Sequence, residues 1–581
     1  MLFFKMDQRN NTYTTMKFNK LSAVLLSACF TIQISTAQQS EIKITNPNQQ
    51  QSLNMPWREC IAVGRAANLL RADCLEHLAT AQQVMGYRFC RFHAIFDDDM
   101  AVVVRNADST LTFQWHQVDK VYDALLKMGI RPFVEINPMP KALASGKQTM
   151  FGYEMNVTPP KSHAEWGYFM ESFATHLIQR YGLDEVRKWY FEVWNEPNLG
   201  AFFGGDKADY FKLYATTAIA LKKVDKGLRV GGPASSNGKW VTDMINFCST
   251  NKVPLDFVST HLYAQDEQIN YPNRKGSPYL IGDYFAAQIK GVQQEVKNSV
   301  RPDLELHYTE WNTQAAKDSA SVTWGDNIYV DNLFGASFIV RNCLELDKTV
   351  SSFAYWVISD IFDEGAIPHS PFSCTYGLMT IHGIPKATYN AFALLRKMEG
   401  TLLTVEKSEL VAPKTNKKDK SKTNQTPALL TSSNGKGAYA VNDLGIIKII
   451  LWNQNFVEIP TNSNWTGSIS IPFLNTKTEY MAVSSTITNG NGSPWESWQQ
   501  MGAPQNPTNL QLDLLRAHAN PLFSFEKIMN VNNQLKLDFT LLPGEVKYIE
   551  IAPKGQVAVK RGISESDAKI MEEQLGQKSK K

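Results

Sequence analysis

The sequence predicts an α/β fold, a (β/α)8 TIM barrel followed by an appended all-β sandwich domain. Up to about Leu395, strand-like apolar runs alternate with helical patterns, which is typical of parallel strands joined by crossover helices. There are eight such runs, the number that closes a barrel. Beyond them, short alternating runs lie between clusters of Asn, Gly, Pro and Ser, which favours a sandwich.

The barrel strands are expected where β-branched and aromatic residues concentrate. In chain order they are Cys60 to Arg65, Tyr87 to Phe92, Arg131 to Ile136, Trp189 to Trp194, Leu228 to Gly232, Asp256 to His261, Glu305 to Thr309 and Ser352 to Val357. Helical patterns fill the gaps, as in His163 to Tyr181, which ends at the stop signal Gly182. Tyr210 to Val224 is a second example.

The sandwich is predicted from three short alternating runs, which are Gly437 to Asn442, Ile446 to Trp452 and Glu545 to Ile551. The expected organisation is a leader and signal peptide at 1–37, an N-terminal segment at 38–57 that is a candidate to pair with the sandwich, the barrel at 58–396, the sandwich at 397–555 and a charged tail at 556–581. Within the sandwich, the lysine-rich stretch 414–426 is expected to be a solvated loop.

The N-terminal pattern predicts export. Lys17 and Lys20 precede an apolar stretch from Leu21 to Ile34, and Ala37 ends a run of small residues suited to cleavage. The stretch from Leu26 to Cys29 also resembles a bacterial lipoprotein box, which would instead leave Cys29 as a lipid anchor. Because apolar residues continue past Cys29, cleavage after Ala37 is preferred, and no membrane span is expected.

Composition narrows the classes of partner. The chain is 43% hydrophobic and 20% charged with a net charge of +3 over 581 residues, so it lacks the basic footprint of a nucleic-acid binder. Six cysteines remain after removal of the signal, and none of them is paired at CxxC spacing. Buried thiols are favoured over bridges, no metal site or other cofactor is expected, and the oligomeric state stays open.

Two glutamates carry most of the chemical information. Glu196 follows the fourth predicted strand and Glu310 follows the seventh, which is where a barrel enzyme keeps its chemistry. An acid after a strand is more often a solvated loop residue or a helix cap. Here Trp194 and Trp311 offer flat apolar faces of the kind that pack under a sugar ring, and Asn195 adds a hydrogen-bond donor and acceptor.

Several motifs together resemble glycoside hydrolase family 39, which includes bacterial β-xylosidases and α-L-iduronidases. The residues that carry the resemblance are Arg91-Phe92-His93, Phe133-Val134-Glu135, Met139-Pro140-Lys141-Ala142-Leu143-Ala144-Ser145-Gly146, Asn156-Val157-Thr158-Pro159-Pro160, Trp194-Asn195-Glu196-Pro197-Asn198-Leu199, Ser259-Thr260-His261-Leu262-Tyr263, Thr309-Glu310-Trp311-Asn312 and Gly383-Ile384-Pro385-Lys386. The resemblance implies a (β/α)8 barrel with an all-β companion and a retaining glycosidase that works by double displacement.

The same resemblance implies the roles of the two acids: Glu196 is the general acid/base and Glu310 the nucleophile. Burial and the charge of Glu310 are expected to raise the pKa of Glu196, whereas hydrogen-bond donors keep Glu310 ionised. A retaining mechanism predicts a carboxyl separation of roughly 5 to 5.5 Å, and a separation nearer 8 Å would indicate inversion.

Supporting residues follow from the resemblance as well. Asn195 is expected to hydrogen-bond the sugar 2-hydroxyl, His261 and Tyr263 to lie beside the nucleophile with Tyr263 orienting it, and His93 to contact a sugar hydroxyl. Trp356 resembles the platform under the terminal sugar. For His93 the alternative is a satisfied core histidine, and for Trp356 it is simple burial.

Two departures from the family pattern bear on the substrate. Asp363-Glu364 stands where many members carry paired glutamates, so the shorter Asp363 reaches sugar hydroxyls differently. Asn137-Pro138 replaces a small-plus-aromatic pair after the third strand. Both residues of the acidic pair, Asp363 and Glu364, are kept as candidate substrate contacts.

The leading prediction is an exo-acting β-D-xylosidase that releases terminal xylose from xylo-oligosaccharides. An α-L-iduronidase-like or other β-glycosidase activity would use the same machinery, but a uronate carboxylate needs a cationic group that the sequence alone does not place. An alternative of another class is a non-catalytic carbohydrate-binding barrel. Loss of either acid would favour that class, yet both are present in intact motifs.

Overall fold

A computed structural model describes residues 40–47, 50–264, 281–313, 328–365, 367–409, 430–431, 435–454 and 464–555. Its centre is a closed barrel in which eight strands pair in parallel with their neighbours in chain order, and the last strand pairs with the first. These strands are β2 (Cys60–Arg65), β3 (Phe89–His93), β6 (Arg131–Ile136), β9 (Tyr190–Val193), β10 (Arg229–Ser235), β11 (Phe257–Tyr263), β12 (Glu305–Asn312) and β13 (Ser352–Tyr355). All eight predicted strands are confirmed, with ends that shift by a few residues.

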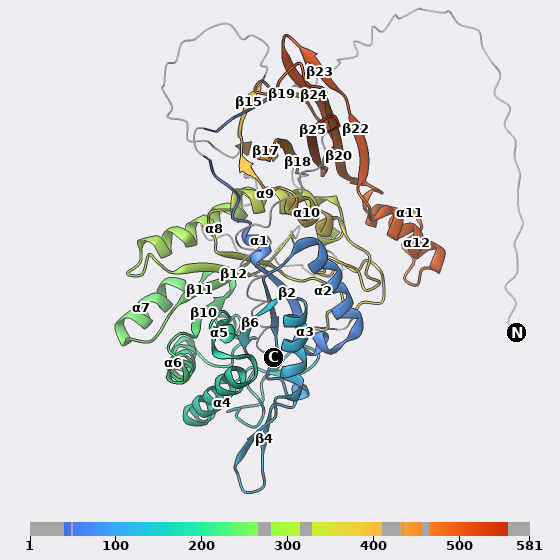
Figure 1. Cartoon of the computed structure of the whole chain (residues 1–581). Helices are drawn as coiled ribbons and strands as arrows, with labels where there is room; N and C mark the ends of the chain where they lie inside the picture. Colours follow the sequence, from blue (N-terminus) through green and yellow to red (C-terminus); the bar gives the residue numbers. More distant parts are fainter. Residues whose placement is uncertain are drawn as a thin grey trace, which may run out of the picture. The chain divides into compact units, whose positions relative to one another are not determined.

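One main helix follows each barrel strand, and Figure 1 shows helices α2, α3, α4, α6, α7 and α8 around the strands. The eight helices are α2 (Ala72–Met85), α3 (His116–Lys127), α4 (His163–Tyr181), α6 (Lys207–Val224), α7 (Val241–Asn251), α8 (Ile281–Asn298), α9 (Leu333–Glu345) and α10 (Ala387–Arg396). The predicted helix at 163–181 is confirmed, and the one predicted from Tyr210 begins one turn earlier because Asp206 caps it through the backbone N–H of Asp209.

Short elements decorate the loops of the barrel. They are the helices α1 (Pro56–Glu59) and α5 (Leu183–Val186), the 3-10 turns η1 (Ala66–Leu70), η2 (Asp98–Met100), η3 (Ser236–Gly238) and η4 (Ile328–Val330), and the hairpins β4 (Val103–Arg105) with β5 (Leu111–Phe113) and β7 (Thr149–Met150) with β8 (Met155–Asn156). Most lie after the carboxyl ends of strands, so they surround the mouth of the barrel rather than its floor.

The interior of the barrel is layered. Near the amino ends of the strands, Phe89, Phe133, Tyr190 and Phe257 form an aromatic floor in which the rings of Phe133 and Tyr190 stack at 4.8 Å. Side chains alternate between faces along a strand, so the residue two positions later points inward again, one layer higher. In that second layer the aromatic residues give way to charged and polar ones: Arg91, Glu135, Glu192 and Thr309.

Two mostly antiparallel sheets form the sandwich, and all of their strands except β1 follow the barrel in the sequence. One sheet has the order β15-β1-β19-β24-β23, and the other has the order β14-β17-β18-β25-β20-β21, with β16 and β22 paired at β17 and β20. The strands are β1 (Ser40–Thr45), β14 (Thr401–Leu402), β15 (Thr404–Glu409), β16 (Leu430–Thr431), β17 (Lys436–Asp443), β18 (Ile446–Asn453), β19 (Trp465–Ile471), β20 (Tyr480–Asn489), β21 (Gly492–Ser493), β22 (Leu522–Glu526), β23 (Ile528–Val531), β24 (Gln534–Leu541) and β25 (Val546–Pro553). Helices α11 (Trp495–Gln500) and α12 (Asn509–His518) lie between β21 and β22 in the chain.

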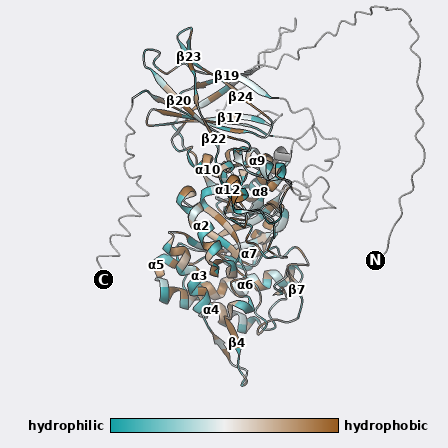
Figure 2. Cartoon of the chain, turned by 90° about the vertical axis from the view of Figure 1, so that its right-hand side faces the viewer, coloured by the Kyte–Doolittle hydropathy of each residue, from teal (hydrophilic) through white to brown (hydrophobic). Residues whose placement is uncertain are grey.

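The sandwich encloses its own apolar core. Its strands carry both hydrophobic and hydrophilic residues in Figure 2, and Ile42, Ile449, Ile469 and Leu541 are among the residues buried between the sheets. β1 pairs with β15 and runs parallel to β19, so the segment before the barrel contributes a strand to this domain. The chain therefore enters the sandwich first and returns to it after the barrel is complete.

Other expectations concern covalent and membrane features. None of the six cysteines in the described residues forms a disulfide, and five of them are buried, as the apolar patterns favoured. No helix in these same residues is both long and apolar enough to cross a membrane. The expected signal peptide with Cys29, the lysine-rich stretch 414–426 and the tail 556–581 lie outside the described residues.

Candidate active site

Glu196 and Glu310 converge at the carboxyl ends of their strands. Nδ1 of His261 lies 3.0 Å from Oε1 of Glu196 and 3.7 Å from Oε2 of Glu310. One carboxylate oxygen of each glutamate and a ring nitrogen of His261 all lie within 4.8 Å of one another. Both acids are buried, with exposed fractions of 7% and 4%. Two residues far apart in the sequence therefore face the same small space.

Local backbone irregularities aim both carboxylates. Trp194 and Glu196 adopt left-handed backbone angles, with φ of 74° and 45°, which are costly for residues other than glycine and concentrate at functional sites. The expectation that Glu310 ends its strand is wrong, because β12 continues to Asn312. Thr260 pairs with Tyr308 while His261 pairs with Glu310, so a bulge at Thr309 shifts the register just before the acid. Such bulges re-aim a side chain beside an active site.

Arg91 on β3 is the electrostatic centre of the site. Its guanidinium is fully buried and donates to Oε2 of Glu192 at 2.6 Å and to Oε1 of Glu310 at 2.6 Å. The remaining nitrogen lies 2.8 Å from Glu135 and donates to Oδ1 of Asn195 at 2.9 Å. Although burial opposes the charge, these carboxylates raise the pKa of Arg91, so it stays cationic. With its amide oxygen held by Arg91, Asn195 can offer its amide N–H to a sugar hydroxyl.

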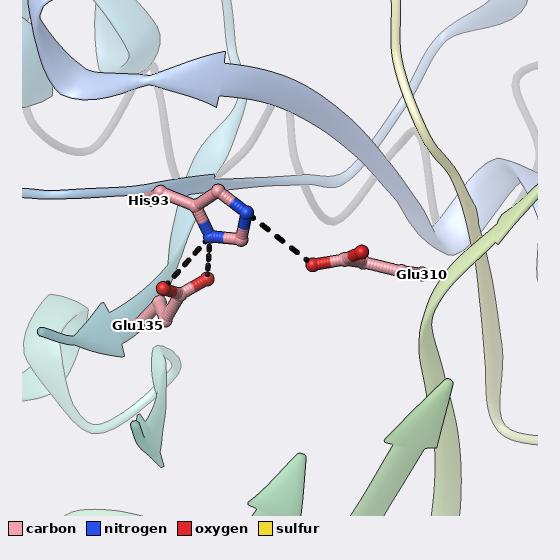
Figure 3. Close-up of side chains that lie close together, drawn as sticks. All are labelled: His93, Glu135 and Glu310. Carbon is pink, nitrogen blue, oxygen red and sulfur yellow. Dashed lines mark hydrogen bonds and ion pairs between the residues drawn. The ribbon is translucent and has the colours of Figure 1, made fainter. Parts of the chain in front are cut away.

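His93 links the charged layer to the mouth, as Figure 3 shows. Its Nδ1 lies 2.9 Å from both carboxylate oxygens of Glu135, and its Nε2 lies 3.6 Å from Glu310. The same Nε2 lies 3.7 Å from Glu364. Burial lowers the pKa of His93 to about 3, so the ring is neutral in the physiological range. With Nδ1 donating to Glu135, Nε2 presents a lone pair toward the cleft and can accept a hydroxyl proton.

Tyr263 on β11 holds the other oxygen of Glu310. Its hydroxyl donates to Oε2 at 2.7 Å, while Arg91 holds Oε1, so the orientation of this carboxylate is set from both sides. Burial raises the pKa of Glu310, and the charge of Arg91 and the hydrogen bond from Tyr263 oppose that shift. Arg91 and Tyr263 are therefore the hydrogen-bond donors that favour an ionised Glu310, and their effect on its pKa opposes that of burial.

Glu364 and Asp363 lie side by side in the chain but do different things. Burial, followed by the charges of Glu310 and Glu196, raises the pKa of Glu364 well above its usual value. Glu364 approaches His93, whereas Asp363 accepts from Nε of Arg65 at 3.0 Å and from the Asn68 side chain at 3.2 Å. Both oxygens of Asp363 are thus engaged by protein groups, and only Glu364 of this pair reaches the central cluster.

The tryptophans of the motifs are core residues rather than exposed platforms. Trp311 is fully buried and stacks on Phe353 at 4.0 Å, so the expectation that it packs under a sugar ring is wrong. Trp194 is also buried and donates its indole N–H to the carbonyl of Phe202. Trp356 is 1% exposed and packs against the His93 ring at 4.4 Å, which places it beside the site but largely covered by protein.

The residues that depart from the family pattern at the third strand have a structural explanation. Asn137 accepts the backbone N–H of Ala94 at 2.7 Å through Oδ1, and its own carbonyl accepts the N–H of Phe96. Ala94 directly follows His93 and has a φ of 66°. Asn137 thus fixes the turn that ends β3, so this departure supports the position of His93 instead of reaching into the cleft.

Two groups of side chains have the spacing of a metal site. They are His93, Glu135 and Glu310, and Glu196, His261 and Glu310, each with three ligand atoms within 4.8 Å. Arg91 already supplies positive charge to Glu135 and Glu310 through contacts of 2.8 and 2.6 Å. A divalent cation at either position would sit against that guanidinium, so the residues present favour hydrogen bonding over metal binding.

Sequence reasoning left four members of this cluster without a role: Arg91, Glu135, Glu192 and Thr309. The alternation of inward-facing and outward-facing positions along each strand is the sequence signal that could have identified them. Arg91, Glu135 and Glu192 each stand two positions after an inward aromatic residue of the floor, in strands that are otherwise apolar. A charge at an inward position of a buried strand must be paired, and pairing these three predicts the network.

Removing the central cation is expected to destabilise the barrel strongly. Arg91→Met leaves Glu135, Glu192 and Glu310 buried without their counterion, at a cost of about 3 to 5 kcal/mol. The matched control is Arg131→Met, which removes a partly exposed guanidinium that pairs with Glu185 at 2.7 Å. This substitution should lower the free energy of unfolding by about 1 kcal/mol or less. Urea unfolding of both variants measures the difference, and equal losses would contradict this account of Arg91.

A closed (β/α)8 barrel with two converging acids at the carboxyl ends of its fourth and seventh strands defines the class of protein: a glycoside-hydrolysing barrel enzyme. The model of the family described as "Glycosyl hydrolases family 39" matches residues 40–535. This chain belongs to that family, and it is a glycosyl hydrolase.

The curated relatives cover nearly the whole chain. A protein described as beta-xylosidase from Caldicellulosiruptor saccharolyticus is 34% identical over 86% of this chain and 96% of its own length. A beta-xylosidase from Geobacillus stearothermophilus is 32% identical over 88% of this chain and 95% of its own. The human alpha-L-iduronidase is 22% identical over 78% of this chain and 69% of its own.

Solved structures agree with this assignment. A monomeric beta-xylosidase from Caulobacter crescentus CB15 superposes with a TM-score of 0.74 at 28% identity, over 89% of this chain and all of that one. A bacterial orthologue of human alpha-L-iduronidase superposes with a TM-score of 0.63 at 15% identity, over 90% of this chain and 85% of that one. The second comparison shows a shared fold.

Proposed function

We propose that this protein is a retaining, exo-acting β-D-xylosidase in which Glu310 is the nucleophile and Glu196 the general acid/base. The observation that carries the proposal is that one carboxylate oxygen of each acid lies within 4.8 Å of the other, with different partners on each acid. Inverting enzymes leave about 6.5 to 9.5 Å between their acids to accommodate a water molecule, so the short spacing supports direct attack by a carboxylate.

The partners of each acid fit its role. Arg91 and Tyr263 donate to both oxygens of Glu310, which favours a carboxylate aimed at the anomeric carbon. Glu196 contacts a neutral ring nitrogen of His261, which can accept a hydrogen bond from the proton that a general acid must carry. After the leaving group departs with that proton, Glu196 would deprotonate the water that cleaves the glycosyl-enzyme.

Charge at the mouth supports a neutral sugar over a uronic acid. A uronate carboxylate needs an available cation, and the described part of the site contains two arginines. Arg91 is surrounded by three carboxylates and the Asn195 amide oxygen. Arg65 pairs with Asp99 and Asp363, and its guanidinium lies 4.2 Å from the centre of the Tyr153 ring. Both guanidiniums are already paired, while Glu364 adds a further acid.

The substrate itself is supported by the relatives, because two beta-xylosidases align with nearly the whole chain at 34% and 32% identity. Xylose lacks the exocyclic carbon of glucose and glucuronic acid, so it is the smallest of these sugars. We further propose that the protein is exported, on the strength of the basic and apolar pattern between Lys17 and Ala37.

A panel of 4-nitrophenyl glycosides tests this function. We expect kcat/KM for the β-D-xyloside to exceed that for the β-D-glucuronide and α-L-iduronide by about 100-fold or more, since the uronates would bring a carboxylate to an acidic wall. The β-D-glucoside is the matched substrate, because it shares the exocyclic carbon of the glucuronide without its charge. Faster turnover of the iduronide than of the xyloside would overturn the proposal, and NMR of the first product should show β-xylose.

A further inference from the structure

Four side chains form a single line of hydrogen bonds that ends on Glu196: Glu192 on β9, Thr309 on β12, His261 on β11, and Glu196 in the loop after β9. The Thr309 hydroxyl donates to Oε1 of Glu192 at 2.8 Å. The same hydroxyl oxygen lies 3.1 Å from Nε2 of His261. At the other end of the imidazole, Nδ1 lies 3.0 Å from Oε1 of Glu196. All four residues are buried.

Counting protons along this line fixes the direction of every bond. A threonine hydroxyl has one proton, and Thr309 donates it in a hydrogen bond to Glu192. The other oxygen of Glu192 accepts a hydrogen bond from Arg91 at 2.6 Å. The Thr309 oxygen must therefore accept from His261, which places the imidazole proton on Nε2. Burial, and after it the charge of Arg91, lower the pKa of His261 well below its usual value, so Nδ1 carries no second proton. The remaining hydrogen bond, between Nδ1 of His261 and Oε1 of Glu196, therefore forms only when Glu196 is protonated and donates its proton.

We propose that Thr309 is a positioning residue which, together with Glu192, holds the His261 proton on Nε2 and thereby keeps Glu196 protonated until it reacts. The inference rests on the proposed role of Glu196 as the general acid/base. Without the hydroxyl of Thr309, His261 is free to place its proton on Nδ1 and donate to an ionised Glu196. The relay thus selects the tautomer that opposes this ionisation.

The same relay assists the second half of the reaction. Once Glu196 has passed its proton to the leaving group, its carboxylate faces the lone pair of Nδ1 instead of a donor. That repulsion makes the carboxylate a stronger base toward the incoming water, and proton transfer from water to Oε1 restores the original hydrogen bond. No external reductant, oxidant or ion takes part, because the proton lost in the first step is regained in the second.

Other charged groups around the relay do not replace it. In the described residues, Glu196 faces Glu310, Glu364 and Tyr263 in addition to His261. The two acids act on Glu196 through charge whichever tautomer His261 adopts, and Tyr263 donates to Glu310. Glu192 faces Arg91, Glu135 and Thr309. Among these groups, Thr309 alone contacts the distal nitrogen of His261, so it is the residue to test.

The test is the pH dependence of kcat/KM for Thr309→Val and Thr309→Ser. With 4-nitrophenyl β-D-xyloside, the valine variant should move the alkaline limb to lower pH by about one unit, the size of one hydrogen bond to an ionisable group. The serine variant keeps the hydroxyl and should retain the limb of the wild type. Thr217→Val is the matched control, because it removes a buried hydroxyl from α6 that bonds Trp166 and Leu213 instead.

A leaving group that needs no protonation separates this role from a structural one. With 2,4-dinitrophenyl β-D-xyloside, kcat/KM of Thr309→Val should match that of the wild type, because this quantity reports only the first step and the leaving group needs no proton, whereas a distorted site would lower kcat/KM for both substrates. An unmoved alkaline limb in the valine variant, or a shift of the same size in the serine variant, would overturn the inference. Failure of the wild type to hydrolyse either xyloside would instead overturn the proposed function.

A second measurement needs no Thr309 variant. Nitrogen-15 NMR of the wild-type protein labelled at histidine distinguishes the two tautomers, and comparison with His261→Gln identifies the signals of that ring. We expect a neutral imidazole protonated at Nε2 between pH 5 and 8. A proton on Nδ1, or a doubly protonated ring in that range, would contradict the relay whatever the activity of the enzyme.

Discussion

Glu310→Ala is expected to lower kcat for aryl β-xylosides on the order of 10⁵-fold, as removal of a covalent nucleophile does in other hydrolases. The physical reason is that no other carboxylate in the described site is held by both Arg91 and Tyr263, so nothing else is aimed at the anomeric carbon. Added azide should restore part of the turnover and yield the α-xylosyl azide, because a small anion fits the space left by the side chain.

Glu310→Gln and Glu171→Ala are the controls for this loss. The amide variant preserves the volume of the side chain and should be equally inactive. Glu171 pairs with Lys223 on the exposed surface of α4 and α6, so its removal should leave kcat unchanged. Undiminished hydrolysis by Glu310→Ala would refute the assignment of the nucleophile.

Glu196→Ala is expected to give a loss that depends on the leaving group. Hydrolysis of xylobiose should fall by about 10³ to 10⁴-fold, because its leaving alkoxide needs a proton. The first step with 2,4-dinitrophenyl β-D-xyloside should be nearly unaffected, while breakdown of the glycosyl-enzyme slows for lack of a base. The alkaline limb of the pH profile should disappear, since it reports loss of the acid's proton.

Rapid-mixing kinetics check this prediction. A burst of dinitrophenolate followed by slow turnover is the expected time course, and azide should accelerate the slow phase and yield the β-xylosyl azide. Equal losses for xylobiose and the dinitrophenyl glycoside would contradict an acid/base role for Glu196 and would point to a structural one.

The two assignments are distinguishable because the two acids have different neighbours. Glu310 is surrounded by donors, whereas Glu196 meets the acceptor nitrogen of His261. Azide therefore gives products of opposite anomeric configuration in the two variants. This contrast arises from environments set by three strands, and no single motif in the sequence contains it.

The barrel was predictable from the sequence because its signals are local. A parallel strand buried on both faces is rich in apolar and β-branched residues, and the apolar residues of a crossover helix repeat at helical spacing, so the eight barrel strands could be found by pattern. The two acids were predictable because each follows an apolar run at a place where barrels carry their chemistry. The ends of the strands could not be predicted in the same way, because the bulge at Thr309 and the extension of β12 to Asn312 depend on pairing with the neighbouring strands.

What the sequence by itself determined was the architecture, the family and the two carboxylates, because strand and helix periodicity and motif spacing are properties of adjacent residues. What only the tertiary structure decided was which side chains meet. Trp311, a candidate sugar platform in the motif, stacks on Phe353 in the core, and Arg91 contacts three glutamates on other strands and Asn195 in the loop after β9. Closing the barrel brings inward positions of distant strands within hydrogen-bond reach, and that convergence sets the charge and the proton positions on which catalysis depends.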